Sequence, residues 1–424
     1  MKTSTLAWLA CAATAVLAAP SWAATNYSPA VSVPSPPVDA FYASRGGELL
    51  WLGEGPDSPA ARELIALLRS SAIDGFDSGP QLAVQAQALI ARARAGESAA
   101  LKDADRLLSI AWVKYVQQLR RPPRGMTYAD PWIAPRSQSA DTILLQAAAA
   151  PSLPNHLSIT TRVNPFYSAL REAALQSDAR GDPRLQASLE RARAFPAKGR
   201  YIVVDSASAR LWMVEDGRIA DSMKVIVGKP STQTPVLASV IYYATLNPYW
   251  NVPPDLAQNL IAKRVLSQGL GYLKSHNYQV LSGFDANAEP VPPDEIDWRA
   301  VADGKARVRI RQLPGPANSM GRVKFGFANG AGVFLHDTPN KDLFASDDRD
   351  LSNGCIRLED ADRLGRWLLR GAIPSADSAE PEQHVMLPAP VPIFITYMTA
   401  HADGKTIAFV DDVYSMARVE TASR

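Results

Sequence analysis

The sequence is poor in cysteine, with Cys11 and Cys355 as its only thiols. Cys11 falls in an N-terminal segment with the features of an export signal, so a processed chain keeps Cys355 alone. A single thiol in an oxidising compartment cannot be half of an internal disulfide, and any disulfide would be intermolecular. Cys355 is therefore expected to be either inert and buried or chemically reactive.

A strong charge excess and long hydrophobic runs are also missing. Lys and Arg number 44 against 42 Asp and Glu, a net charge of +2 that falls to +1 if Lys2 leaves with the signal. This balance lacks the basic excess of a nucleic-acid-binding protein, so no nucleic-acid partner is expected. No segment beyond the N-terminus is long and apolar enough for a transmembrane span.

Motifs for metal ions and cofactors are absent as well. The sequence has no H-E-x-x-H, no C-x-x-C and no glycine-rich phosphate loop. A structural zinc site needs four ligands, and only one thiolate is available. Four histidines are scattered singly and are interpreted as surface or packing residues: His156, His276, His384 and His401. We therefore expect neither a metal ion nor a cofactor.

The N-terminus predicts export. Lys2 precedes the apolar run 6–19, and Ser21 and Ala23 supply small residues for cleavage after Ala23. Residues 1–23 are therefore predicted to be a signal peptide, and the proline-rich segment 24–38 a flexible leader. Lipid attachment at Cys11 is the weaker alternative, because Trp8 stands where a lipoprotein signal usually has leucine.

Residues 39–199 are predicted to form an all-α region. Leu64, Leu67 and Leu68 recur at helical spacing, with Gly75 as a stop, and 104–119 forms one amphipathic face that ends before two prolines. Four prolines break the pattern at 122–136, and 155–195 becomes helical again.

The pattern changes to short strands over 200–415. Strand candidates are 201–204, 211–214, 223–227, 240–243, 308–310, 333–335 and 393–397. An insertion at 254–300 is helix-like at first, and a short helix at 361–368 is expected to stop at Gly371. The fold class is thus α+β: a mostly β domain, a sheet or sandwich, with a helical insertion, preceded by the all-α region.

The chemistry centres on Cys355, nineteen residues after His336. A thiol attacks a carbonyl as thiolate, so it needs a base or a cation that lowers its pKa. His336 follows the apolar run 333–335 and is the favoured base. Gly354 allows a tight turn that directs backbone N–H groups to an oxyanion. The competing interpretation is a buried, inert cysteine beside a packing histidine.

Three neighbours have assigned but open roles. Arg357 offers a bidentate partner to a carboxylate, either the substrate's or a structural one. Ser352 is expected to hydrogen-bond within the loop that also contains Asn353. Asp337 would orient the imidazole or be a solvated turn residue, in which case a backbone carbonyl would orient the ring.

Several motifs together resemble the L,D-transpeptidases with a YkuD-type catalytic domain, most closely their YcbB-like branch. The resemblance covers about 200–415 and, faintly, 39–121 as a scaffold domain. Its motifs are His336–Pro339, Leu351–Arg357, Asn247–Pro254, Gly228–Pro230 with Thr234-Pro235, Pro314–Asn318 and Gly321–Phe325.

The resemblance implies a periplasmic enzyme of peptidoglycan synthesis and cell shape that is acylated by carbapenems. Cys355 would attack the third residue of a stem peptide and expel D-alanine, with His336 as base and Gly354–Cys355 as oxyanion hole. A second stem would accept the acyl group, giving a 3→3 cross-link. Stem peptides are thus the expected partners, with wall-synthesis proteins as further candidates.

The resemblance also implies that the insertion at 254–300 is a lid over the acyl pocket. Tyr249, Trp250 and Tyr272 are candidate pocket walls, or simply core residues. Two departures stand out: Phe334 replaces a tyrosine common in relatives, and 122–200 lacks the pattern of a peptidoglycan-binding domain.

Sequence alone leaves rival functions open. The same site with water as acceptor would be an L,D-carboxypeptidase or an endopeptidase, and with a lysine acceptor it would attach lipoproteins to the wall. A non-catalytic wall-binding scaffold with a vestigial site is the rival of another class.

Overall fold

The computed structural model describes residues 35–376 and 380–417 of the chain. The predicted signal peptide, most of the predicted leader and Cys11 lie outside the described residues. The end of the predicted leader differs from expectation, because Pro36–Val38 already form the first turn of helix α1. None of the helices in the described ranges is both long and apolar enough to cross a bilayer.

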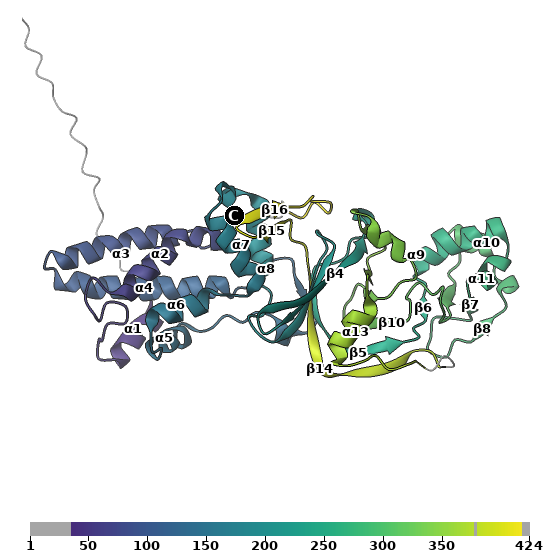
Figure 1. Ribbon diagram of the computed structural model, residues 1–424, viewed down its shortest axis with the longest axis horizontal. Coiled ribbons are helices and arrows are strands. Elements are labelled where there is room, and N and C mark those ends of the chain that lie inside the picture. The colour runs from purple at the N-terminus through teal and green to yellow at the C-terminus, as the bar shows by residue number, and fades with distance from the viewer. Residues whose placement is uncertain (1–34, 377–379, 418–424) are drawn as a thin grey trace, which may run out of the picture. The chain divides into compact units, whose positions relative to one another are not determined.

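The expected helical N-terminal region is confirmed (Figure 1, purple to blue). Prolines in the first turn begin several helices, where a missing N–H costs nothing, and Gly75 ends a 3-10 turn in the left-handed conformation (φ 74°). The helices are α1 Pro36–Ser44, α2 Pro59–Ser70, α3 Gly79–Arg94, α4 Ser98–Leu119, α5 Ala140–Ala148, α6 Leu153–Thr161, α7 Pro165–Leu175 and α8 Pro183–Ala192.

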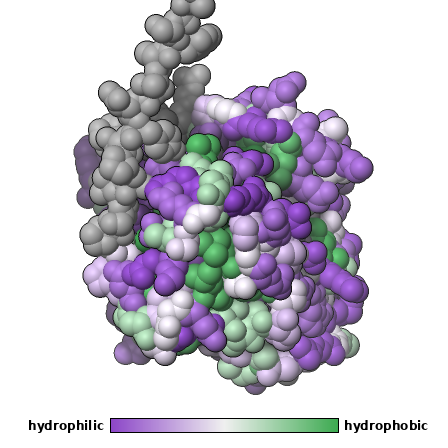
Figure 2. Space-filling view, turned by 90° about the vertical axis from the view of Figure 1, so that its left-hand side faces the viewer, coloured by the Kyte–Doolittle hydropathy of each residue, from purple (hydrophilic) through white to green (hydrophobic). Residues whose placement is uncertain are grey.

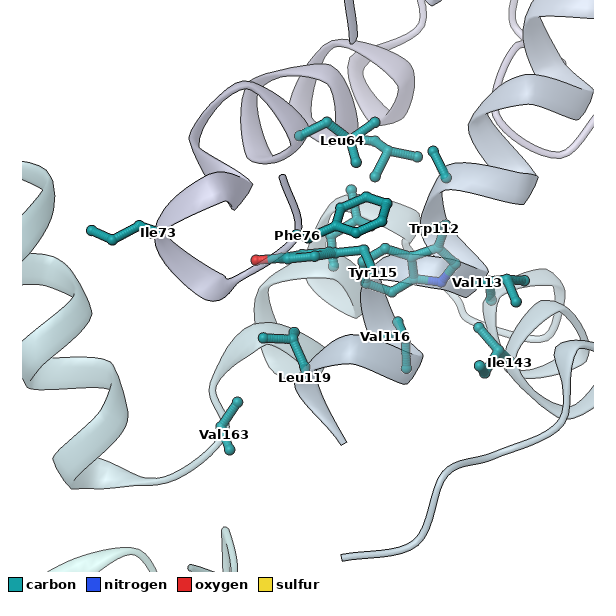
Figure 3. Packing of buried hydrophobic residues seen from close by; sticks show 14 of the residues in the cluster. Leu64, Ile73, Phe76, Trp112, Val113, Tyr115, Val116, Leu119, Ile143 and Val163 are labelled. Atoms are coloured by element: carbon teal, nitrogen blue, oxygen red, sulfur yellow. The ribbon is translucent and has the colours of Figure 1, made fainter. Parts of the chain in front are cut away.

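The core of this region is built around α4. Trp112 and Tyr115 are fully buried and pack their rings at 6.3 Å, and Phe76 lies 5.9 Å from Tyr115 (Figure 3). The same buried cluster continues to Tyr201 and Phe394 of the β domain. The surface of the helical region that Figure 2 shows is largely hydrophilic, with small hydrophobic areas among the hydrophilic residues.

Asp105 of α4 holds the backbone of residues 50–52, in the segment between α1 and α2, in place. It is fully buried, accepts the backbone N–H groups of Leu50, Trp51 and Leu52 at 2.9, 2.7 and 2.7 Å, and also accepts the hydroxyl of Tyr42. The carboxylate thus satisfies donors that would otherwise be buried without a partner.

Replacing Asp105 with alanine should lower the free energy of unfolding by about 3–5 kcal/mol, because it orphans a set of buried donors. Chemical denaturation followed by circular dichroism measures the loss. Asp103 is an exposed carboxylate two residues earlier on α4, so Asp103→Ala is the matched control and should change the free energy of unfolding little. Equal stability of the two variants would contradict this role.

The β domain is one sheet that closes on itself. Its order is β5-β10-β11-β13-β4-β3-β2-β14, and β14 pairs with both β2 and β5, so the hydrogen-bonded path returns to its start. Short β1 (Thr127–Tyr128), from the proline-rich break, pairs with β5. The strands are β2 Arg200–Asp205, β3 Arg210–Glu215, β4 Arg218–Gly228, β5 Leu237–Leu246, β10 Val323–Phe327, β11 Leu335–His336, β12 Asp350–Ser352, β13 Ile356–Leu358 and β14 Gln383–Thr396.

Long β14 is the strand that closes the ring, seen in yellow beside β5 (Figure 1). Its pairing with β5 shifts register between Met386 and Val391, where Pro388 and Pro390 cannot donate ladder hydrogen bonds. Helix α13 (Ala361–Leu369) packs beside β14. It ends with Arg370 in the left-handed conformation (φ 55°), not at Gly371 as predicted.

The insertion is wider than the predicted 254–300 and is not only helical. The predicted strand at 308–310 belongs to the insertion, whose four-stranded sheet has the order β6-β9-β7-β8 and its own buried cluster. Its elements are β6 Trp250–Asn251, α9 Pro254–Leu256, a π-helical turn Ala257–Ala262, α10 Lys263–Gln268, α11 Gly271–Ser275, β7 Tyr278–Leu281, β8 Pro290–Val291, α12 Trp298–Ala302 and β9 Arg309–Gln312.

The last strands of the described residues lie next to the helical region. Hairpin β15 (Ala400–Asp403) and β16 (Thr406–Phe409) packs on α7, and the segment after it runs back to the β domain. Arg191 of α8 donates to the carbonyls of Tyr397 and Met416 at 2.6 and 2.7 Å, which fastens this segment at both ends.

Candidate active site

Two adjacent parallel strands place the backbone segments that carry the predicted nucleophile and base side by side. In β11 and β13, Leu335 lies opposite Ile356 and His336 lies opposite Arg357. Leu335 and Ile356 belong to the buried core of the sheet. Since side chains alternate along a strand, His336 and Arg357 project from the other face, with Cys355 two residues before Arg357.

His336 is held by a backbone carbonyl. It is 4% exposed, and its Nδ1 lies 2.6 Å from the carbonyl oxygen of Asp337. A proton on Nδ1 donates to this carbonyl, which leaves Nε2 with the free lone pair of a base. The Asp337 carboxylate instead accepts Lys341 Nζ at 2.8 Å and the Arg322 N–H at 3.0 Å. Of the two ring partners left open by the sequence, the carbonyl is therefore the one observed.

The buried environment favours the uncharged form of both His336 and Cys355. Burial lowers the pKa of His336 to about 4, and the charges of Arg357 and Lys324 lower it further against the hydrogen bond to Asp337. Burial also raises the pKa of the Cys355 thiol, which the Phe334 backbone and the Arg357 charge only partly offset. Desolvation thus outweighs the nearby cation, which favours a neutral thiol that would lose its proton during attack.

The cysteine loop is shaped by Ser352, as predicted. Its Oγ donates to the Cys355 carbonyl at 2.6 Å and accepts the Gly354 N–H at 3.1 Å, while Gly354 adopts φ 110°, a conformation that favours glycine. The Gly354 N–H is therefore already used, which corrects its predicted role as an oxyanion donor. No hydrogen bond in the described ranges uses the Cys355 N–H. Asn353 is exposed at the tip of the loop.

A second loop, Gly228–Pro235, lies against the cysteine loop. Thr234 Oγ1 donates to the Gly354 carbonyl at 2.8 Å and accepts the Gly228 N–H at 2.8 Å. Thr232 Oγ1 and the Lys229 N–H both donate to the Ser352 carbonyl, at 3.2 and 3.0 Å. A Cβ at Gly228 would lie 2.1 Å from the Thr232 carbonyl oxygen, so this second loop can fold back on itself as closely as this only with glycine there.

Tyr414, which the sequence analysis missed, supports this second loop from below. Its hydroxyl donates to the Gly228 carbonyl and lies 3.4 Å from the Thr234 N–H. Its ring stacks on Tyr397 at 4.9 Å, and its N–H donates to the Tyr397 hydroxyl at 2.8 Å. No local signal marks this residue, because its partners in the second loop, Gly228 and Thr234, are about 180 positions away in the sequence.

Tyr414→Phe should lower kcat by about tenfold with little change in KM, because the lost hydroxyl leaves a buried carbonyl unpaired beneath the loops that position Cys355. Steady-state kinetics on a soluble donor peptide measure the change. Tyr242→Phe, which removes an exposed hydroxyl on β5, is the control. A rise in KM with an unchanged kcat would contradict a positioning role.

Charged and aromatic neighbours complete the site. Lys324 of β10 is the register partner of His336, so this histidine lies between Lys324 and Arg357, two cations that sequence reasoning did not combine. Lys324 Nζ is 5.4 Å from the Phe334 ring and 3.4 Å from Glu382. Within residues 35–376 and 380–417, Arg357 forms no ion pair.

The predicted pocket walls fall into two groups. Glu382 also accepts the Tyr249 N–H at 3.2 Å, which places Tyr249 near Lys324 and the base. Trp250 instead belongs to strand β6 of the insertion's sheet, and its ring packs on Tyr278. The ring of Tyr272 packs on Tyr278 as well. Among the described residues, no cluster of three His, Cys, Asp or Glu side chains could hold a metal ion.

Comparison with known families decides what kind of domain this site belongs to. Residues 199–393 match the family model described as the L,D-transpeptidase catalytic domain, named YkuD. The chain carries an L,D-transpeptidase catalytic domain. Residues 36–173 match a model described as a scaffold domain, which reaches well past the faint resemblance at 39–121.

The chain is also similar to several individual proteins. A Haemophilus influenzae protein named "Putative L,D-transpeptidase" is 28% identical over 396 residues, 89% of this chain and 77% of that protein. An L,D-transpeptidase from Mycobacterium smegmatis aligns with 47% of this chain and 60% of its own, at 13% identity and a TM-score of 0.24. A mutant L,D-transpeptidase of Enterococcus faecium aligns over 47% and 50%, at 12% identity and a TM-score of 0.24. The chain thus spans only half to three fifths of these two solved structures.

Proposed function

We propose that the protein is a peptidoglycan L,D-transpeptidase that forms 3→3 cross-links through a Cys355 acyl-enzyme. The observation that carries this proposal is the strand register that sets His336 beside the Arg357–Cys355 segment, inside the domain that matches the L,D-transpeptidase family. The predicted signal peptide supports a periplasmic location, where the wall polymer is accessible.

Acylation would begin from the neutral pair. The Cys355 sulfur attacks the carbonyl carbon of the third stem residue as its proton passes to Nε2 of His336. Because the Asp337 carbonyl accepts the Nδ1 proton, the resulting imidazolium keeps its orientation. It then protonates the amine of D-alanine, which leaves, and the third residue stays bound to sulfur as a thioester.

The Cys355 N–H is the best-placed donor to the oxyanion, since the Gly354 N–H is bonded to Ser352. Further N–H groups would become available only if that bond opens when substrate binds. The Phe334 backbone also interacts with the sulfur and partly offsets the rise in its pKa.

Positive charge would select the stem peptide that donates the acyl group. Arg357 has no carboxylate partner among the described residues and affects the pKa of both His336 and Cys355, so its charge lies close to both. A guanidinium in this position suits a stem carboxylate next to the scissile bond. Lys324 adds a second cation on the other side of His336.

Transfer to an amine rather than to water requires that the thioester be shielded until the acceptor docks. The insertion begins at Tyr249 and Trp250, next to the Lys324–Glu382 pair, so it is the natural shield. Hydrolysis, which would make an L,D-carboxypeptidase or endopeptidase, and transfer to a lipoprotein lysine use the same donor half-reaction.

Product analysis tests the proposal. Incubation with disaccharide-tetrapeptides should yield 3→3 cross-linked dimers and free D-alanine, identified by mass spectrometry of the products. Tripeptide monomers as the sole product would show a hydrolase, and a conjugate with an added lysine peptide would show lipoprotein attachment. Absence of every one of these products would support the vestigial scaffold.

A further inference from the structure

A second cationic site lies in the helical region, away from Cys355. It is a cavity of about 480 Å³ whose lining includes Arg120, Arg136, Arg162 and Arg193 but no aspartate or glutamate. These arginines come from separate places in the chain: the end of α4, the proline-rich segment, the end of α6 and the stretch after α8. The fold therefore brings these four arginines to one cavity.

Two of the guanidinium groups lack the partners that buried cations normally have. Arg120 is half-buried, and no ion pair or side-chain hydrogen bond satisfies it within residues 35–376 and 380–417. Burial lowers its pKa, with no carboxylate to compensate. Arg193 is 7% exposed, and its Nη1 donates to the carbonyls of Asp74 and Gln118 at 2.7 and 3.4 Å. Its charge helps to lower the pKa of Glu190, but its buried Nε has no acceptor among the described residues.

Such an arrangement is costly unless an anion occupies it. Buried polar groups are nearly always paired, and an unpaired guanidinium in a partly apolar cavity is strongly disfavoured. Chains usually place an acidic side chain there, as this one does at Arg171, which pairs with buried Asp74 at 2.7 Å. In the described part of the chain Arg120 has no acidic partner, and the three further arginines in the lining of this cavity come without any acid there, so a ligand explains the lining better than packing does.

The walls indicate the class of anion. Apolar side chains of Val116, Ile133, Ile159 and Phe195 separate the arginines, and Gln138 and Gln146 add neutral amides. Phosphate is best bound by donors that converge on one point, whereas spaced guanidinium groups with apolar surface between them suit several carboxylates on a short peptide. A cavity of this size accommodates a ligand of a few residues.

We propose that this cavity binds a carboxylate-bearing stem peptide of peptidoglycan and so holds the protein on the wall. The inference rests on the proposed function for its choice of polymer. It assigns wall attachment to the helical region, in a chain where residues 122–200 show no pattern of a separate peptidoglycan-binding domain.

Co-sedimentation with purified peptidoglycan sacculi tests this site. In a full-length Cys355→Ala background, which prevents covalent capture, Arg120→Gln combined with Arg162→Gln should weaken retention by about tenfold. Arg62→Gln combined with Arg69→Gln, two exposed arginines on α2, removes the same charge and should not. Sacculi whose carboxylates have been amidated should retain the parent as poorly as native sacculi retain the cavity variant.

Equal retention of the two double variants, or retention that survives amidation, would overturn the proposal. Arg162 is exposed, so Arg162→Gln alone decides the matter if the double variant unfolds. With Cys355 present, both double variants should process a soluble tetrapeptide like the parent. A parent that binds sacculi through the cavity but processes no tetrapeptide would refute the proposed function and leave this site standing.

Discussion

Cys355→Ala is expected to abolish D-alanine release and cross-linking, with a fall of about 10⁴-fold or more. The sulfur forms the acyl-enzyme bond, and no second thiol among the described residues can replace it. Without it, His336 and the cations can only bind the donor. Product analysis by mass spectrometry and a D-alanine assay on the same samples measure the loss.

Stability should not explain that loss. Cys355 is half-buried, and its Sγ lies 3.9 Å from the Gly332 carbonyl, a weak contact, so the variant should unfold close to the parent's temperature. Exposure to meropenem gives an independent readout: the parent should gain the mass of one carbapenem, and Cys355→Ala should gain none. Cross-linking by the variant at the parent's rate would end the cysteine mechanism.

His336→Gln is expected to lower kcat/KM by about 10²–10⁴-fold, because the thiol would have no base at the moment of attack. The thiol pKa is raised by burial, so spontaneous ionisation at neutral pH does not substitute for the imidazole. His384→Gln removes an exposed histidine from β14 and is the matched control, expected to retain the parent's rate.

The pH profile of the parent distinguishes the two possible resting states. Only neutral imidazole accepts a proton, and the pKa of His336 is lowered to about 4, so activity should persist down to about pH 5 and fall below it. Alkylation by iodoacetamide should be slow at pH 7 and rise in the alkaline range. An acid limb near the ordinary histidine pKa of about 6.5, or fast alkylation at neutral pH, would indicate a thiolate–imidazolium pair instead.

The same pKa shift affects folding. The unfolded chain binds a proton at His336 more readily than the folded chain, because the folded pKa is the lower of the two. As pH falls from about 6.5 towards 4, protonation therefore favours the unfolded state, and the contribution of His336 to stability is lost in that window.

Local patterns were enough to predict most of the elements and to select Cys355 and His336 as candidate nucleophile and base. The helices of the N-terminal region and most strands of the β domain follow from apolar spacing within a few residues. The boundaries of the insertion did not, because the run at 308–310 has the same strand pattern in either sheet. Only the pairing of β9 with β6 and β7 assigns it to the insertion. Helix α5 was missed because its alanine-rich segment has a weak apolar face.

By itself, the sequence predicted Cys355 as the nucleophile, His336 as the base and a glycine turn beside them, since these predictions depend on residue type and short spacing. Only the tertiary structure showed the burial that favours the uncharged forms of both side chains, the Asp337 carbonyl as the orienting group of the ring, the engagement of the Gly354 N–H, and the support from Tyr414. The reason is physical: burial sets the cost of charge, and contacts between distant segments decide which hydrogen bonds are already made.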